Sequence, residues 1–233
     1  MANFHWTNDI EEAKKEQQTL ADLVEIKKST FNMLQFNSGL AIGTAYEENT
    51  KRAFAVCAIF DKDGNVISKF IETNVEVNFS YVAGLLAFRV GPAICLAIND
   101  IFDKVDLLLF DGQGVAHPLG FGLASHIGVL FNKPSIGITK KALFGKYNKL
   151  PKGKYYTDLK HPKTKAKIGY CISPGHENKP FFMSPGHQIT FTESLEVMQM
   201  LVKDNYLPKP IRLVHARANI LAREYWNKMK KSK

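Results

Sequence analysis

The stretch Val105-Asp106-Leu107-Leu108-Leu109-Phe110-Asp111-Gly112-Gln113-Gly114 decides how the fold of this chain is interpreted. Its first half is a largely continuous apolar run, which is typical of a central parallel strand covered on both faces. Asp111 then stands at the carboxyl end of that strand, where open α/β sheets bind their ligands. The glycines that follow would let a ligand approach the backbone closely. On these residues alone, Asp111 is either a site residue or an aspartate that caps the next turn.

The segments before this strand predict a small antiparallel sheet. An amphipathic helix is expected over residues 9–28, and strands are expected over 38–46, 53–60 and 66–71. Residues 61–65 have the composition of a turn, so the last two strands should form a hairpin. A tight connection of this kind joins antiparallel strands, and we expect all three strands to pair in that way.

The segments after residue 84 alternate between helices and buried strands. Helices are expected over 84–102 and 119–131, and a second buried strand follows Lys133 and ends at Ile138. Three antiparallel strands followed by helix, strand, helix and strand is the order of a ribonuclease H-like fold. The predicted fold class is therefore α/β, with a ribonuclease H-like mixed sheet of three antiparallel and then parallel strands, flanked by helices.

The last third of the chain has a different character. From Lys146 onward, lysines alternate with tyrosines, and this pattern predicts extra short strands near 155–183 that are joined by long basic loops. Two or three such strands are expected. Helices are then expected over 192–205 and 211–229.

Length and charge limit the class of protein. The 233 residues can bury a full core, so residues 1–227 are expected to form one domain and 228–233 a disordered basic tail. The net charge of +9 favours a polyanionic partner, because each Lys or Arg near a phosphate releases a counterion. No signal peptide or membrane-spanning run is visible, so a cytoplasmic protein with no membrane partner is expected.

The cysteines give no sign of a disulfide framework or a zinc ribbon, because they are three in number and form no CxxC pair. Cys57 and Cys95 lie in apolar runs and are expected in the core. Cys171, His176 and His187 do not have a recognised zinc spacing.

Ser125 and His126 are neighbours on an expected helix. Their side chains would point about 100° apart, so they do not form a nucleophile and its base. His126 is predicted to be a packed, hydrogen-bonded residue.

Four further side chains could take part in binding or chemistry. Tyr81 precedes a helix and either packs in the core or wedges into a base stack. Lys140 follows the second buried strand and suits phosphate contact, although many strand ends carry solvated lysines. His117 is either a site residue or a loop histidine bonded to backbone. His215 could bind a metal, although a single histidine on an apolar helix is more often a core residue.

Taken in order, these segments resemble the endonuclease V family. The resemblance extends over nearly the whole chain and includes the segment that enters a helix, the strand-end motif around Asp111 and the segments after it. The matching segments are 79–89 (FSYVAGLLAFR), 111–114 (DGQG), 116–118 (AHP), 122–128 (GLASHIG), 134–140 (PSIGITK), 184–187 (SPGH) and 212–215 (RLVH).

The resemblance implies a nuclease that cleaves DNA or RNA near deaminated purines, chiefly deoxyinosine or inosine, at the second phosphodiester on the 3′ side. Mg²⁺ or Mn²⁺ would support hydrolysis by activating water and stabilising the leaving oxygen. By position, the implied catalytic residues are Asp111, His215 and Lys140, with Asp111 as a metal ligand. The implied wedge and base pocket comprise Tyr81, Gly84, Leu86, Gly112, Gln113, Gly114, His117, Gly122 and Leu123.

Two acidic positions of the family pattern are empty in this chain. Gly43 stands where the first strand should supply an aspartate, and Val90 stands where a glutamate should follow. Glu47 and Glu48 lie further along, more than about 13 Å from Gly43 in an extended strand. Because Mg²⁺ prefers several oxygen ligands, one carboxylate and one imidazole are expected to hold it poorly.

Three hypotheses for the function remain open. The first is an endonuclease V-like protein that binds inosine or deoxyinosine in nucleic acid, with metal-dependent cleavage lost or strongly impaired. The second is an active Mg²⁺- or Mn²⁺-dependent inosine-specific endonuclease in DNA repair or RNA processing. The third is a non-catalytic interaction subunit that buries Tyr81 and the glycine motif against another chain. The resemblance implies a monomer.

Overall fold

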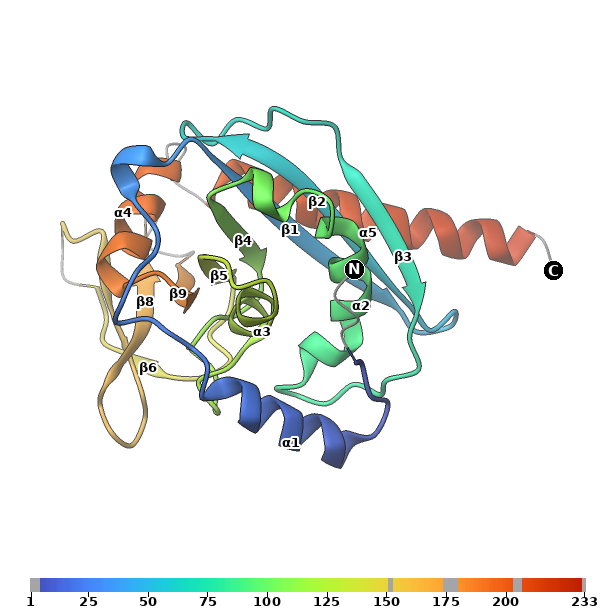
Figure 1. Ribbon diagram of the computed structural model, residues 1–233, viewed down its shortest axis with the longest axis horizontal. Helices are drawn as coiled ribbons and strands as arrows, with labels where there is room; N and C mark the ends of the chain where they lie inside the picture. Colours follow the sequence, from blue (N-terminus) through green and yellow to red (C-terminus); the bar gives the residue numbers. More distant parts are fainter. Residues whose placement is uncertain (1–4, 151–152, 174–179, 203–206, 232–233) are drawn as a thin grey trace.

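The computed structural model describes residues 5–150, 153–173, 180–202 and 207–231, and its centre is a nine-stranded mixed sheet (Figure 1). The strand order is β3-β2-β1-β4-β5-β9-β8-β7-β6. The strands are β1 (Ser38–Glu47), β2 (Arg52–Asp61), β3 (Ile71–Glu76), β4 (Leu107–Asp111), β5 (Ser135–Thr139), β6 (Lys146–Tyr147), β7 (Tyr156–Lys160), β8 (Lys167–Ile172) and β9 (Phe181–His187).

The first five strands have the pairing that the sequence predicts. β1, β2 and β3 are antiparallel neighbours, and β4 lies parallel to both β1 and β5. β4 is fully buried except at Asp111, as expected for a central strand covered on both faces. The predicted α/β fold class, a ribonuclease H-like mixed sheet flanked by helices, is confirmed.

The third strand starts later than predicted. Residues 66–71 were expected to return beside β2, but the regular strand begins only at Ile71, and Val66 forms an isolated bridge with Phe60. The side chain of Ser68 explains the interruption. Its hydroxyl accepts the Ile59 N–H at 2.9 Å and so takes the place of a strand carbonyl.

The far side of the sheet holds four strands, one or two more than predicted. β9 lies antiparallel to β5, and β8, β7 and β6 continue the sheet outward. Every residue of β9 is buried, because the strand lies between two layers of side chains. Pro185 is accommodated there by a shift of register between Ser135 and Ile136 of β5.

Helices cover both faces of the sheet (Figure 1). One apolar cluster joins the sheet to the first three helices, and a second joins it to the last two. The helices are α1 (Ile10–Ala21), α2 (Leu86–Ile98), α3 (Leu123–Leu130), α4 (Phe191–Leu201) and α5 (Lys209–Lys231), with short 3₁₀ turns at Met33–Gln35 and Phe102–Lys104. None of the described helices has the length and apolar character needed to cross a membrane.

Several helix ends differ from the prediction. α2 starts at Leu86 rather than at residue 84, because Gly84 has a positive φ of 93° that no helix contains. The disorder predicted from residue 228 onward is wrong for residues 228–231, which form the end of α5. Residues 203–205 of the expected helix over 192–205 lie outside the described residues.

His126 lies in an aromatic cluster under α3. Its ring centroid is 5.0 to 5.4 Å from those of Phe121, Phe88 and Trp6, and the side chain is fully buried. The prediction of a packed residue is confirmed, but neither ring nitrogen has a hydrogen-bond partner among the described residues. Burial lowers the pKa of His126 to about 3, so the ring is neutral at pH 7.

We expect acidification to destabilise the fold through His126. The pKa of His126 is lower in the folded chain than in the unfolded chain, so the unfolded chain takes up the proton first as the pH falls below about 6.5. Between pH 7 and pH 5 this group should cost about 2 kcal/mol of unfolding free energy. Urea unfolding at both pH values should show a drop that is smaller by about that amount in His126→Phe.

The control is His161→Phe, which removes a partly exposed histidine from the β7–β8 turn. Equal drops in His126→Phe and in the unsubstituted protein would show that His126 does not carry this pH dependence.

Candidate functional site

A pocket of about 250 Å³ lies at the carboxyl end of β4. Its walls come from α1, from the loop and first turn of α2, from the segment between β4 and α3, and from the end of β5. The lining residues are Gln17, Tyr81, Val82, Gly84, Leu86, Ala87, Asp111, Gly112, Gln113, His117, Gly122, Leu123, Thr139 and Leu143. Every residue implied for the wedge and base pocket is present in this lining except Gly114.

Gln17 ties the pocket wall to α1. Its side-chain amide donates to the carbonyl of Gly84 at 2.8 Å and to that of Phe121 at 3.1 Å. These two bonds join the loop before α2 to the loop before α3. Gln17 was not predicted from the sequence, although a polar residue on the inner face of an amphipathic helix was a possible sign.

The glycines around the pocket let backbone pack against backbone or side chains. A Cβ at Gly122 would lie 2.4 Å from the carbonyl oxygen of Gln113, and one at Gly112 would lie 2.8 Å from Leu123 Cδ2. At Gly114, which does not line the pocket, a Cβ would lie 2.0 Å from the carbonyl oxygen of Pro185. These glycines therefore shape the pocket through close packing as well as through access for a ligand.

His117 is a buried side chain in the pocket wall. Burial lowers the pKa of His117 to about 4, against a smaller opposing effect of the Gly84 backbone. The backbone N–H of Leu119 donates to Nδ1 at 3.3 Å, so the neutral ring carries its proton on Nε2. Nε2 is buried beside Gly84 and has no hydrogen-bond partner of good geometry among the described residues.

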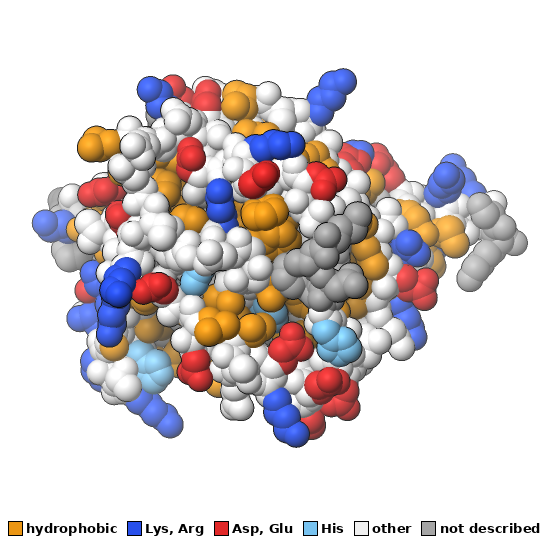
Figure 2. Space-filling model, viewed as in Figure 1, with side chains coloured by type: hydrophobic (Ala, Val, Ile, Leu, Met, Phe, Trp, Pro, Cys, Tyr) orange, Lys and Arg blue, Asp and Glu red, His pale blue; other side chains and the backbone are white. Residues whose placement is uncertain are grey.

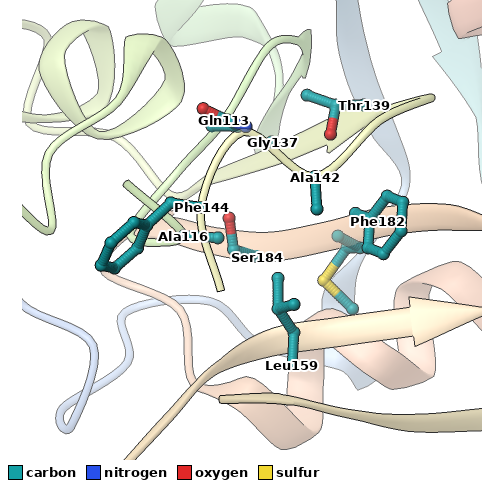
Figure 3. Close-up of a pocket in the computed structure, with 10 residues that line it drawn as sticks. Gln113, Ala116, Gly137, Thr139, Ala142, Phe144, Leu159, Phe182 and Ser184 are labelled. Atoms are coloured by element: carbon teal, nitrogen blue, oxygen red, sulfur yellow. The ribbon is translucent and has the colours of Figure 1, made fainter. Parts of the chain in front are cut away.

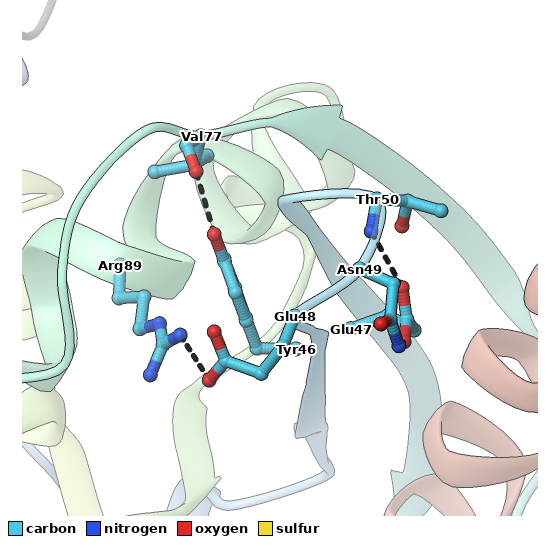
Figure 4. A network of polar contacts seen from close by, with 7 residues as sticks. All are labelled: Tyr46, Glu47, Glu48, Asn49, Thr50, Val77 and Arg89. Carbon is cyan, nitrogen blue, oxygen red and sulfur yellow. Dashed lines mark hydrogen bonds and ion pairs between the residues drawn. The ribbon is translucent and has the colours of Figure 1, made fainter.

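Tyr81 stands beside the pocket, above a packed arginine. Its side chain is 69% exposed, and the guanidinium of Arg89 lies 5.6 Å from its ring centroid and 3.7 Å from that of Tyr46. Arg89 also pairs with the carboxylate of Glu48 (Figure 4). The Tyr46 hydroxyl donates to the Val77 carbonyl at 2.7 Å, so the ring beneath Arg89 is fixed.

Asp111 and His215 meet at the edge of the pocket. The imidazole Nδ1 of His215, from α5, contacts the carboxylate of Asp111, from the end of β4. Asn219, one helical turn further on, donates its side-chain amide to the His215 carbonyl at 2.8 Å. His215 is partly exposed, and it is not the core residue that a lone helical histidine usually is. Lys140 is exposed and does not line the pocket.

Gly43 lies directly beneath the backbone of α5. A Cβ at this position would lie 2.6 Å from the carbonyl carbon of Val214 and 2.7 Å from the backbone nitrogen of His215. Real side chains essentially never come so close to a backbone. An aspartate at residue 43 would therefore require α5 to move away from β1.

Glu47 and Glu48, the two nearby carboxylates, are engaged elsewhere. Glu47 closes the β1–β2 turn by accepting from the Thr50 N–H and from the Asn49 side chain, both at 2.7 Å. Glu48 pairs with Arg89 (Figure 4). Neither lines the pocket, so neither replaces the carboxylates absent from the family positions.

The residues present do not fit a firmly held Mg²⁺ or Mn²⁺. Asp111 supplies one carboxylate and His215 one imidazole, whereas Val90 is 1% exposed within the apolar core. In the part of the chain that the structure describes, no group of three or more His, Cys, Asp or Glu side chains could bind a metal ion. Mg²⁺ requires near-octahedral oxygen ligands, which this set cannot supply.

Fold and site together define an α/β protein with a ribonuclease H-like sheet and a pocket where its central parallel strands end. Comparison with known proteins makes this class more specific. The model of the family described as Endonuclease V matches residues 18–216. The chain belongs to the endonuclease V family.

Individual relatives agree with this assignment. An endonuclease V of Thermosipho melanesiensis is 36% identical over 199 residues, which cover 85% of this chain and 87% of the relative. The crystal structure of endonuclease V from Streptomyces avermitilis has a TM-score of 0.83 and 27% identity, covering 97% of this chain and 96% of its own. Ciona intestinalis endonuclease V, solved with a DNA containing an inosine, has a TM-score of 0.79 at 20% identity and covers 93% of this chain and 98% of its own.

We expect Gly43→Ala to destabilise the protein, because the added methyl group meets the α5 backbone, which cannot rotate away as a side chain can. Overpacking of this kind costs about 1–3 kcal/mol of unfolding free energy, and Gly43→Asp should cost more. Urea denaturation measures both values. A loss below about 0.5 kcal/mol, the usual range for surface substitutions, would show that α5 does not depend on close contact with Gly43.

Proposed function

We propose that this protein recognises inosine or deoxyinosine in DNA or RNA, and that metal-dependent phosphodiester cleavage is lost or strongly impaired. The family activity is cleavage of the second phosphodiester 3′ to the inosine. One observation supports both parts of the proposal. All the residues implied for the base pocket except Gly114 line one pocket, while Gly43 lies beneath the α5 backbone where the family pattern has an aspartate.

The pocket suits a flipped purine base. Leu86 and Leu123 offer apolar walls. The Nε2–H of neutral His117 is covered by the loop at Gly84, and it would donate to an acceptor such as the carbonyl oxygen of hypoxanthine if this loop moves when the base enters. The exposed ring of Tyr81 would wedge into the stack that the base leaves. The inosine-containing DNA bound to the Ciona intestinalis relative supports this ligand class.

Impaired cleavage follows from the chemistry of the remaining groups. Two carboxylates of the family pattern are absent, and losing a catalytic carboxylate lowers the rate by orders of magnitude. Asp111 and His215 instead contact each other. Lys140 directly follows the end of β5, and from there its side chain would contact a phosphate of the nucleic acid. We take the protein to act as a cytoplasmic monomer with residues 1–227 in one domain.

Binding measurements test the recognition. Fluorescence anisotropy with matched strands that carry inosine or adenosine at one position should give tighter binding to inosine across a salt series. His117→Ala should reduce this preference at least about fivefold, because a hydrogen bond to the base is worth roughly 1 kcal/mol or more. Tyr81→Phe, which keeps the ring, is the control. Equal, negligible affinity for both strands would refute recognition of inosine.

A cleavage assay tests the lost activity. With Mn²⁺ and stoichiometric protein, deoxyinosine DNA and inosine RNA should stay intact under conditions in which the Thermosipho melanesiensis relative cleaves completely. Multiple turnovers would instead establish an active nuclease with a rearranged metal site. Gly43→Asp combined with Val90→Glu should restore only part of the relative's rate, because α5 occupies the space that the aspartate needs. Full restoration of the rate would show that α5 moves away from β1 at little cost in free energy.

A further inference from the structure

The positive charge of the chain is concentrated in one segment. Of the 31 basic and 22 acidic residues, ten lysines and one aspartate lie within residues 140–167. This segment alone carries a formal charge of +9, which equals the net charge of the whole protein. The rest of the chain holds 21 basic and 21 acidic residues and is neutral overall. The basic character is thus a property of β6, β7, the start of β8 and their loops.

The lysines of this segment that the structure describes are exposed and largely unpaired. Lys146, Lys149, Lys160 and Lys163 are exposed, and none of the four forms an ion pair with another described residue. The one aspartate of the segment, Asp158, is already bound to Lys167 at 3.1 Å. In Figure 2, lysine and arginine side chains gather along the left edge of the molecule, where these strands lie in Figure 1.

A continuous line of contacts joins this basic surface to the pocket. Leu143, which is 51% exposed, lines the pocket, and the adjacent Phe144 packs against His161 in the β7–β8 turn at 5.1 Å between ring centroids. Leu159 and Phe182 belong to an apolar cluster against which Ala142 packs, and together with Phe144 they line a small pocket beside this segment (Figure 3). The segment therefore lies firmly on the sheet and leads from the pocket to β6.

Tyrosines stand among the lysines. The ring of Tyr147, in β6, is 45% exposed and packs against Phe182 at 5.2 Å, so its outer part is free to meet a ligand. Tyr156, at the start of β7, is 39% exposed and held edge-on against Tyr170. Cations that follow a backbone, with aromatic rings between them, are the features by which proteins bind single-stranded nucleic acid.

We propose that the surface formed by β6, β7 and the described residues of their loops binds the single-stranded nucleic acid that flanks the base held in the pocket. The lysines contact successive phosphates, and Tyr147 stacks on a base. This inference rests on the proposed function for the pocket itself. It adds that much of the binding energy comes from a second surface, which does not distinguish inosine from other bases.

The test compares two variants of equal charge. In the first, Lys146, Lys149, Lys160 and Lys163 are all changed to Gln. In the second, the control, four exposed lysines outside the segment are changed to Gln; these are Lys28, Lys62, Lys69 and Lys104. Binding is measured by anisotropy with single strands that carry one inosine or one adenosine and have 3 or about 12 flanking nucleotides on either side, in separate arms.

The unsubstituted protein should bind the long strand more tightly than the short one. At low salt, the affinity of the first variant for the long strand should be lower by a factor of at least about ten. Its slope of log affinity against log salt should fall by about 3, at roughly 0.7 per phosphate contact on a single strand. The control variant should keep both values. Tyr147→Ala should weaken binding of the long strand at least about fivefold, and Tyr147→Phe should not.

The ratio of inosine to adenosine affinity separates this inference from the proposed function. The ratio should stay unchanged in the first variant, because the pocket is intact. An equal loss in both lysine variants, no gain from longer flanks, or a larger effect on duplex than on single strands would overturn the inference. A ratio of one in the unsubstituted protein would overturn recognition by the pocket but leave the effect of flank length to be judged separately.

Discussion

Helix α5 lies on β1 through direct contact of backbone with backbone, and this contact exists because residue 43 has no side chain. The same contact brings His215 to Asp111, so the end of the central strand is closed by an imidazole. In the family pattern a carboxylate belongs in this space. The position of α5 and the absence of a side chain at residue 43 are therefore two aspects of one packing arrangement, and neither can be changed without the other.

The pocket and the contact between Gly43 and α5 belong to opposite layers of the molecule. The pocket is built by α1, α2 and the segment before α3, whereas His215 and the backbone above Gly43 come from α5 on the other face. The two layers meet at Asp111. Since each layer packs through its own apolar cluster, the packing of α5 on β1 can change while the walls of the pocket keep their shape. This separation gives a physical reason why recognition could outlast cleavage.

Much of the fold was predictable from local pattern, because β4 is a pure apolar run and the strands before it follow ordinary turn chemistry. The pocket was predictable through the family motif. The features of the fold and site that were not predicted depend on contacts between segments that are distant in the sequence. Gln17 reaches two loops far along the chain, and Ser68 ends a strand through its side chain. The partner of His215 and the crowding at Gly43 depend on how α5 crosses β1, which residue spacing within one helix does not reveal.

One of the two edges of the sheet is the two-residue strand β6, and both of its residues are exposed. A strand this short presents few unpaired backbone groups to another chain, and lysines at such an edge further discourage strand-to-strand association. The charges that would attract a nucleic-acid strand would also repel a second copy of this protein. A bound polyanion would cancel that repulsion, so the protein should be most prone to self-association along this edge when its lysines are occupied.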